Sequence, residues 1–217
     1  MHNEPVDYLG VVLLVAVVAA TFVVIARAVV SQGRRARTEQ ANQLRLARRT
    51  AETDVNSFGD EVNRLAVLAD YDPRAADIYA LVSALHGGAR EALQEARRPD
   101  DFGRVTAILA EGRLAAARLA ACAAGQPTPA RRPPCFFNPG HGPSARNVTW
   151  QRRSVPACAA DAARVAAGAD PYIRTVERDD RRVPYWEGGP AYAGWADGYY
   201  ASWRGDRLVA DIAPNNI

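Results

Sequence analysis

The sequence predicts a mainly α-helical protein, in which a transmembrane helix leads into an antiparallel helical bundle and then a small α+β, treble-clef-like module of hairpins and a short helix. Three observations predict this order: an apolar stretch near the N-terminus, helical spacing of apolar residues up to Gly125, and short alternating segments after a proline-rich linker. The expected parts are an N-terminal tail and transmembrane helix (1–30), the bundle (31–125), the linker (126–134), a Cys/His module (135–205) and a C-terminal tail (206–217).

The bulk composition limits the class of protein. A chain of 217 residues has room for one ordinary soluble domain or two small ones beside the membrane segment, which excludes a large multidomain enzyme. The hydrophobic content of 48% and the charged content of 24% are ordinary, so they indicate neither disorder nor a polytopic membrane protein. Three cysteines cannot all pair within one chain, so we do not expect a disulfide scaffold.

The stretch from Tyr8 to Val30 is long enough for a transmembrane helix, because about 20 apolar residues span the hydrocarbon layer. The leader MHNEPVD lacks the basic region of a secretory signal peptide, so we expect the helix to be retained. The arginines that follow predict a single-pass plasma-membrane protein with its N-terminus outside and its domain in the cytoplasm. Some of these arginines are expected either to face anionic lipid or only to set the topology: Arg27, Arg34, Arg35 and Arg37.

Three stripes of apolar residues predict the bundle helices. The first runs from Ala51 to Ala69 at spacings of three and four, and it ends before Pro73. The second runs from Ile78 to Leu93. The third follows the capping residues Asp100 and Asp101, carries apolar residues from Phe102 to Cys122, and ends at Gly125. Short connections make such helices antiparallel neighbours, and homo-oligomers could form through them.

After the linker PTPARRPP, the pattern changes to short strands. Residues 147–151 alternate as a strand does, and an alanine-rich helix is expected after Cys158. Segments 173–176 and 183–186 flank a polar turn over 177–182, which predicts a second hairpin.

Four residues with metal-binding side chains occur as two close pairs. Cys135 and His141 flank a turn rich in proline and glycine, while Cys158 and Asp161 have C-x-x-C spacing with a carboxylate in place of the second thiol. Zinc takes four tetrahedral ligands from thiolate, imidazole and carboxylate groups, often as two pairs separated by a hairpin. We therefore predict that these four residues form a structural zinc site.

Each of these residues also has an alternative role. Five residues separate Cys135 from His141, where a zinc knuckle usually has two to four, and Asp161 could instead stabilise the dipole of its helix. The cysteines could simply be buried, or Cys135 could be a nucleophile with His141 as its base. Cys122 and His86 have no partners at ligand spacing, so we expect them to be ordinary packing or surface residues.

Three sequence elements resemble a known group of proteins: CFFNPGHGPS, VPACAADAARVAAGADP and RRVPYWEGGPAYAGW. They resemble the C-terminal region of uncharacterised actinobacterial membrane proteins, some of which carry TPM-type domains. The resemblance covers roughly residues 100–205, and the CFF-NP-HGP element is its specific part. In those relatives the second pair often consists of two cysteines, so Asp161 is a departure from the pattern. No TPM domain precedes the module here, so the resemblance implies no phosphatase activity.

Four aromatic residues follow at helical spacing near the C-terminal end: Tyr192, Trp195, Tyr199 and Trp203. The favoured interpretation is that these rings cover the small module, because aromatic side chains bury large areas. The alternative is an exposed surface that binds a protein partner or lies at the membrane interface.

These observations favour a membrane-anchored cytoplasmic interaction or scaffold protein, with an unknown protein partner and no evident catalytic site. One alternative is a Cys/His-dependent or metal-dependent enzyme at the membrane. Another is an arginine-rich module that binds lipid or nucleic acid. Because the arginines are interleaved with acidic residues along most of the chain, we do not expect nucleic-acid binding.

Overall fold

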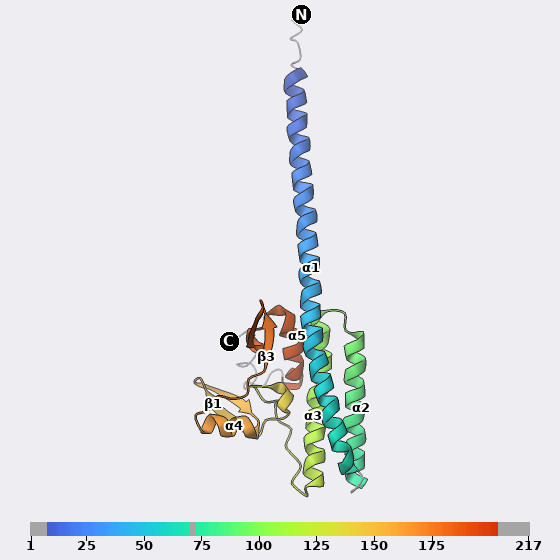
Figure 1. Ribbon diagram of the computed structural model, residues 1–217, viewed down its shortest axis with the longest axis vertical. Coiled ribbons are helices and arrows are strands. Elements are labelled where there is room, and N and C mark those ends of the chain that lie inside the picture. Colours follow the sequence, from blue (N-terminus) through green and yellow to red (C-terminus); the bar gives the residue numbers. More distant parts are fainter. Residues whose placement is uncertain (1–7, 70–72, 204–217) are drawn as a thin grey trace, which may run out of the picture. The chain divides into compact units, whose positions relative to one another are not determined.

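The computed structural model describes residues 8–69 and 73–203 and is mainly helical, as predicted (Figure 1). Its helices are α1 Tyr8–Ala69, α2 Pro73–Glu95, α3 Phe102–Ala123, α4 Ala159–Ala166 and α5 Pro190–Tyr199, with short 3-10 turns η1 Pro99–Asp101, η2 Pro139–His141, η3 Tyr185–Glu187 and η4 Ala201–Trp203. Its strands are β1 Arg146–Trp150, β2 Arg153–Ala157, β3 Thr175–Arg178 and β4 Arg181–Pro184. The predicted C-terminal tail (206–217) lies outside the described residues, as do residues 1–7 and 70–72.

The chain divides into two compact units, Met1–Asn42 and Gln43–Ile217, and the boundary falls inside α1. The first unit contains the N-terminal part of α1. On that part the side chains of Arg27, Arg34, Arg35 and Arg37 are exposed. The bundle, the hairpins and the candidate metal centre belong to the second unit.

The predicted transmembrane helix is wrong: across residues 8–69 and 73–203, no helix is both long and apolar enough to cross a membrane. Residues 8–30 do not form a separate helix but continue within α1 into an arginine-rich segment. Arg27 also lies inside the predicted span, where a charge is costly. The prediction of a single-pass plasma-membrane protein, with its N-terminus outside and its domain in the cytoplasm, is therefore also wrong. The predicted lipid-facing role of Arg27, Arg34, Arg35 and Arg37 stays a prediction.

The bundle forms where the C-terminal part of α1 packs with α2 and α3 (Figure 1). The predicted stripe on α1 is buried from Ala51 to Val62 and partly buried at Leu65 and Ala69, and Phe58 is fully enclosed. A Cβ on Gly112 of α3 would lie 2.6 Å from the Phe58 ring, so the glycine permits this close approach. Arg48 of α1 donates to the carbonyls of Leu93 (3.0 Å) and Ala96 (2.6 Å) at the end of α2, as antiparallel helices require.

The two hairpins are each two-stranded and antiparallel, β1 with β2 and β3 with β4. The second hairpin was expected to turn over residues 177–182, but its strands continue inward to Arg178 and Arg181. The reason is a two-residue turn in which Asp179 and Asp180 both have positive φ, 49° and 58°. Such a turn matches the twist of the strands, and aspartate tolerates this conformation better than most residues.

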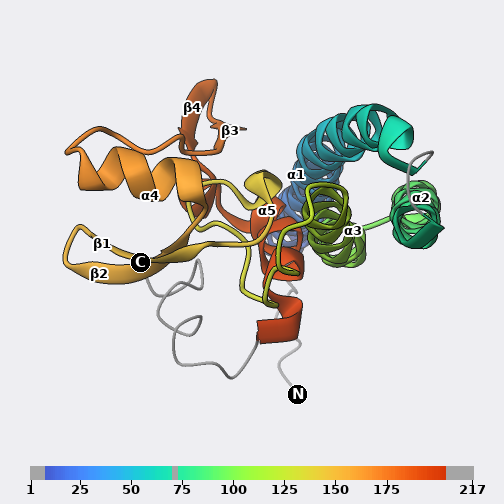
Figure 2. The same ribbon diagram turned by 90° about the horizontal axis from the view of Figure 1, so that it is seen from below.

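The bundle, α5 and the β3–β4 hairpin share one hydrophobic core, while β2 and the Cys135 loop belong to a second, smaller cluster. Helix α5 lies against α3, on the side away from α2 (Figure 2). A Cβ on Gly198 of α5 would lie 2.1 Å from the carbonyl oxygen of Gly103 on α3, so the two backbones are in direct contact. Thr106 of α3 donates a hydrogen bond of 2.7 Å to the carbonyl of Trp195 across the same contact. Helix α5 is therefore fixed to α3 by direct backbone contact and by a hydrogen bond.

Candidate metal centre

The structure brings the four predicted ligands together. Cys135 follows the linker, His141 ends η2, Cys158 is the N-cap of α4, and Asp161 lies in the first turn of α4. One potential ligand atom from each side chain lies within 4.8 Å of the other three. The four residues are therefore close enough to bind a metal ion.

A tight turn explains how five residues between Cys135 and His141 can still form a pair. The 3-10 turn η2 contains Pro139 to His141, so the loop between the two ligands is compact. The side chain of Asn138 caps this turn by accepting a hydrogen bond from the N–H of Gly140 at 2.9 Å. Gly142 then takes a φ of +81°, which favours glycine, and its carbonyl accepts from the N–H of Cys135 at 3.0 Å. The loop closes on itself and returns His141 to Cys135.

Asp161 Oδ2 is the shared centre of the contacts. It lies 2.9 Å from His141 Nδ1, and the thiols of Cys135 and Cys158 each donate to it at 3.3 Å. Cys158 Sγ lies 3.6 Å from the same His141 nitrogen. The second oxygen, Oδ1, accepts from the backbone N–H of Tyr172 at 2.8 Å, which fixes the orientation of the carboxylate.

Burial controls the acidity of these groups. It raises the pKa of the fully buried Cys135 thiol to about 12, and it also raises the pKa of the partly buried Cys158 thiol. For Asp161 burial likewise favours the neutral form, but hydrogen bonds from Tyr172, Cys135, Cys158 and His141 outweigh it and lower the pKa. A buried thiol with a raised pKa is a poor nucleophile, so these observations do not support Cys135 as the nucleophile of a Cys/His pair.

Aromatic side chains pack against the Cys135 loop and donate hydrogen bonds to its backbone. Phe136 stacks on Trp186 with ring centroids 4.8 Å apart, and its carbonyl accepts from the hydroxyl of Tyr185 at 3.0 Å. The carbonyl of Cys135 accepts from the hydroxyl of Tyr200 at 3.2 Å. The loop is therefore fixed by buried hydrogen bonds as well as by packing.

The aromatic tail does not form the alternative interaction surface. Tyr192, Trp195 and Tyr199 are at most 2% exposed, while Trp203 is partly buried and packs against the same core. The favoured interpretation, that these rings cover the core, agrees with the structure. The reason is that α5 turns its aromatic side toward the bundle instead of toward solvent.

Asp54 of α1 is an important residue that the sequence pattern does not single out. It is 5% exposed and accepts hydrogen bonds from Trp195 Nε1 (2.9 Å) and Tyr199 Oη (3.0 Å) at one oxygen, and from Arg174 (2.7 Å) at the other. The backbone N–H of Arg174 donates to the carbonyl of Phe137 at 2.7 Å. Asp54 therefore connects the bundle with the residues beside the metal centre.

The remaining cysteine and a second histidine have no part in the cluster. Cys122 lies on α3 and is partly buried, and His86 of α2 makes an edge contact with Phe58 at a centroid distance of 5.9 Å. Both have the ordinary packing roles that were expected of them.

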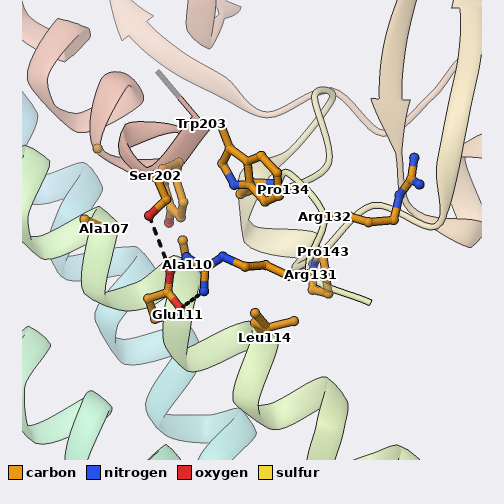
Figure 3. A pocket seen from close by; sticks show the side chains of 12 residues that line it. Ala107, Ala110, Glu111, Leu114, Arg131, Arg132, Pro134, Pro143, Ser202 and Trp203 are labelled. Atoms are coloured by element: carbon orange, nitrogen blue, oxygen red, sulfur yellow. Dashed lines mark hydrogen bonds and ion pairs between the residues drawn. The ribbon is translucent and has the colours of Figure 1, made fainter. Parts of the chain in front are cut away.

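The linker is attached to the bundle around a small cavity of about 20 Å³ (Figure 3). Arg131 forms an ion pair with Glu111 of α3, and Ser202 also donates to Glu111. The guanidinium group of Arg132, by contrast, points away from this cavity (Figure 3). A space of this size holds about one water molecule, so it is no ligand site.

In comparisons with known proteins, no family model, no curated protein and no solved structure matches this chain. The resemblance of the Cys/His segment to actinobacterial membrane proteins therefore stays a prediction.

Proposed function

We propose that this chain is an interaction or scaffold protein whose C-terminal region is held together by a structural zinc ion. The observation that carries the proposal is the convergence of Cys135, His141, Cys158 and Asp161, each with one ligand atom within 4.8 Å of the others. Two thiolates, one imidazole and one carboxylate form a donor set that suits zinc better than magnesium or calcium, which prefer oxygen ligands.

The distances between the ligand atoms support a tetrahedral ion. With Zn–S near 2.3 Å and Zn–N or Zn–O near 2.0–2.1 Å, a tetrahedron places sulfur about 3.6 Å from nitrogen or oxygen and nitrogen about 3.3 Å from oxygen. The Cys158 Sγ to His141 Nδ1 distance is 3.6 Å, and the two sulfur to Asp161 Oδ2 distances are 3.3 Å. The 2.9 Å between His141 Nδ1 and Asp161 Oδ2 must lengthen by about 0.4 Å and the two 3.3 Å distances by about 0.3 Å, while the widest separation in the cluster, up to 4.8 Å, must shorten by about 1 Å.

The order of the elements supports a treble-clef-like arrangement. The Cys135–His141 loop comes first, the β1–β2 hairpin follows, and α4 supplies the last two ligands from its first turn. Around this site the local apolar cluster has only six buried residues: Cys135, Phe136, Phe137, Val155, Ala157 and Ala162. So small a core benefits from a metal ion that joins its separate segments.

A metal-dependent enzyme is the second candidate, because His141 and Cys158 line a cleft. Four protein ligands fill a tetrahedral zinc site, however, whereas a catalytic zinc keeps one position for water or substrate. The donor count therefore favours the structural role.

Metal analysis tests the proposal. The purified full-length chain should contain stoichiometric zinc by inductively coupled plasma mass spectrometry, and C158S should lose most of it. C122S is the matched control, because Cys122 lies outside the cluster, and it should keep its zinc. Metal-free wild-type protein after growth with zinc, or equal zinc in C158S and C122S, would refute the assignment.

A further inference from the structure

A cleft of about 840 Å³ lies beside the metal centre. This volume is in the range of small-molecule sites, and its walls are mainly apolar with a few polar groups, as is usual for such sites. The lining residues come from α3, the linker, the loop before β1, the start of α4 and Tyr172. Two ligands of the metal centre, His141 and Cys158, form part of the wall.

Two polar side chains of the cleft have unsatisfied atoms. Ser144 is 4% exposed, and its Oγ has no hydrogen-bond partner among the described residues. Its backbone is fixed, because its N–H donates to the carbonyl of Pro133 at 2.8 Å. Arg132 donates from Nη2 to Asn147 Oδ1 at 3.2 Å, but its buried Nε also lacks a partner. A buried polar atom without a partner is costly, and a ligand that supplies an acceptor removes that cost.

The N-terminus of α4 opens into the same cleft. Two N–H groups near the start of the helix already have acceptors on Cys158. The N–H of Asp161 donates to its sulfur, and the N–H of Ala162 donates to its carbonyl. Ala159 and Ala160 both line the cleft, and as the first two residues of α4 their N–H groups have no acceptor within the helix itself. Free N–H groups at a helix N-terminus attract anions.

The charge around the cleft is also suitable for an anion. No acidic residue lines it, and Arg132 is its one charged lining residue among those described. A zinc ion with two thiolates and one carboxylate carries a net charge of about −1. The guanidinium of Arg164, which lies 4.1 Å over the ring of Tyr172 in the cleft wall, adds a second positive charge that offsets it.

We propose that this cleft binds an oxyanion, either the phosphate or the carboxylate group of a small ligand, between Arg132, Ser144 and the N-terminus of α4. The proposal builds on the proposed metal centre, because zinc holds His141 and Cys158 in the wall. Arginine and backbone N–H groups recognise both kinds of oxyanion, and the apolar remainder of the cleft accommodates the rest of the ligand.

Isothermal titration calorimetry on the full-length chain, with its zinc content measured beforehand, tests the proposal. Inorganic phosphate and acetate are titrated separately, and saturable binding of either one supports it and identifies the oxyanion. R132Q should weaken that binding about tenfold, as expected for a lost charge-assisted hydrogen bond. R181Q is the matched control, because Arg181 is exposed on β4 and does not line the cleft, and it should bind as the wild type does.

Ala160→Leu provides a second variant that fills the cleft from an exposed helix position, and it should also weaken binding. Zinc-loaded protein that binds neither anion overturns the proposal, as does equal binding in R132Q and R181Q. Protein without zinc that still binds phosphate through Arg132 supports the cleft and instead refutes the metal centre. The two failures are therefore distinguishable.

Discussion

Replacing Asp54 by alanine should destabilise the folded chain by about 3–5 kcal/mol, the usual cost of removing one partner of a buried ion pair. Asp54 is 5% exposed and accepts three hydrogen bonds, one of them from the guanidinium of Arg174. In D54A the indole N–H of Trp195, the hydroxyl of Tyr199 and the charge of Arg174 all lose their acceptor. Each buried donor left unsatisfied costs about 1–3 kcal/mol, so three of them cost about 3–9 kcal/mol, and the expected loss lies in the lower part of that range.

The matched variant D54N separates charge from hydrogen bonding. Its amide oxygen can still accept from Trp195 and Tyr199, which share one carboxylate oxygen, but its NH2 group faces the donor of Arg174. The loss of one charge-assisted hydrogen bond costs about 1.5–3 kcal/mol, so D54N should lie between wild type and D54A.

Urea denaturation followed by tryptophan fluorescence measures these differences at constant zinc concentration. D60A is the control, since Asp60 is exposed on the same helix and its loss should change stability by no more than about 0.5 kcal/mol. If D54A and D60A lose similar amounts, or if D54N is as unstable as D54A, the proposed contribution of this network is incorrect.

Three further predictions concern pH, the metal ion and helix packing. Burial raises the pKa of Asp54 above 3.8 despite the opposing effects of Arg174, Tyr199 and Trp195. Burial therefore offsets part of what the ionised carboxylate gains from Arg174, so the stability of wild type relative to D54N should be greatest below the unfolded pKa and should fall as the pH rises through the folded pKa of Asp54, which denaturation series at several pH values measure. Chelation should lower the unfolding free energy of wild type and of C122S but leave C158S unchanged, because zinc binds the folded state; an equal chelator effect in all three would contradict this. Gly198→Ala should lower stability by about 1–3 kcal/mol or more, because its Cβ would lie 2.1 Å from the Gly103 carbonyl. Gly88→Ala, with no atom within 4 Å of its Cβ, should instead raise stability by about 0.5–1 kcal/mol, and thermal melts that show the same sign for both would refute this packing argument.

The bundle helices and the proposed metal ligands could be predicted because the sequence patterns that indicate them involve residues close together in the chain. Apolar spacing of three and four residues, with Pro73 and Gly125 as boundaries, identifies helices close to those observed. The ligands Cys158 and Asp161 could be recognised by residue type and spacing alone, since a turn of helix places both on the same side. The membrane prediction failed although its signal was also local, because it considered the apolar stretch without the rest of α1.

Features that depend on distant parts of the chain could not be predicted. Asp54 falls outside the apolar stripe of α1, so the pattern places it toward solvent. It is buried because α5 covers it, and its partners Arg174, Trp195 and Tyr199 are 120 to 145 residues away in the sequence. The two-residue turns of the hairpins were missed for another reason: Gln151-Arg152 and Asp179-Asp180 adopt positive φ without the glycine that usually marks such turns.

The same distant contacts imply that metal binding and bundle packing are energetically coupled. Cys135 is a proposed metal ligand, and its carbonyl accepts from the hydroxyl of Tyr200, which directly follows α5. Two residues later the carbonyl of Phe137 accepts from Arg174, whose side chain reaches Asp54 on α1. Two short chains of buried hydrogen bonds therefore link the candidate metal centre to the helices, and a displacement of the Cys135 loop would disturb both. Because these hydrogen bonds join the small cluster around the Cys/His segment to the core of the bundle, loss of the ion should weaken the attachment of α5 as well as the local loop.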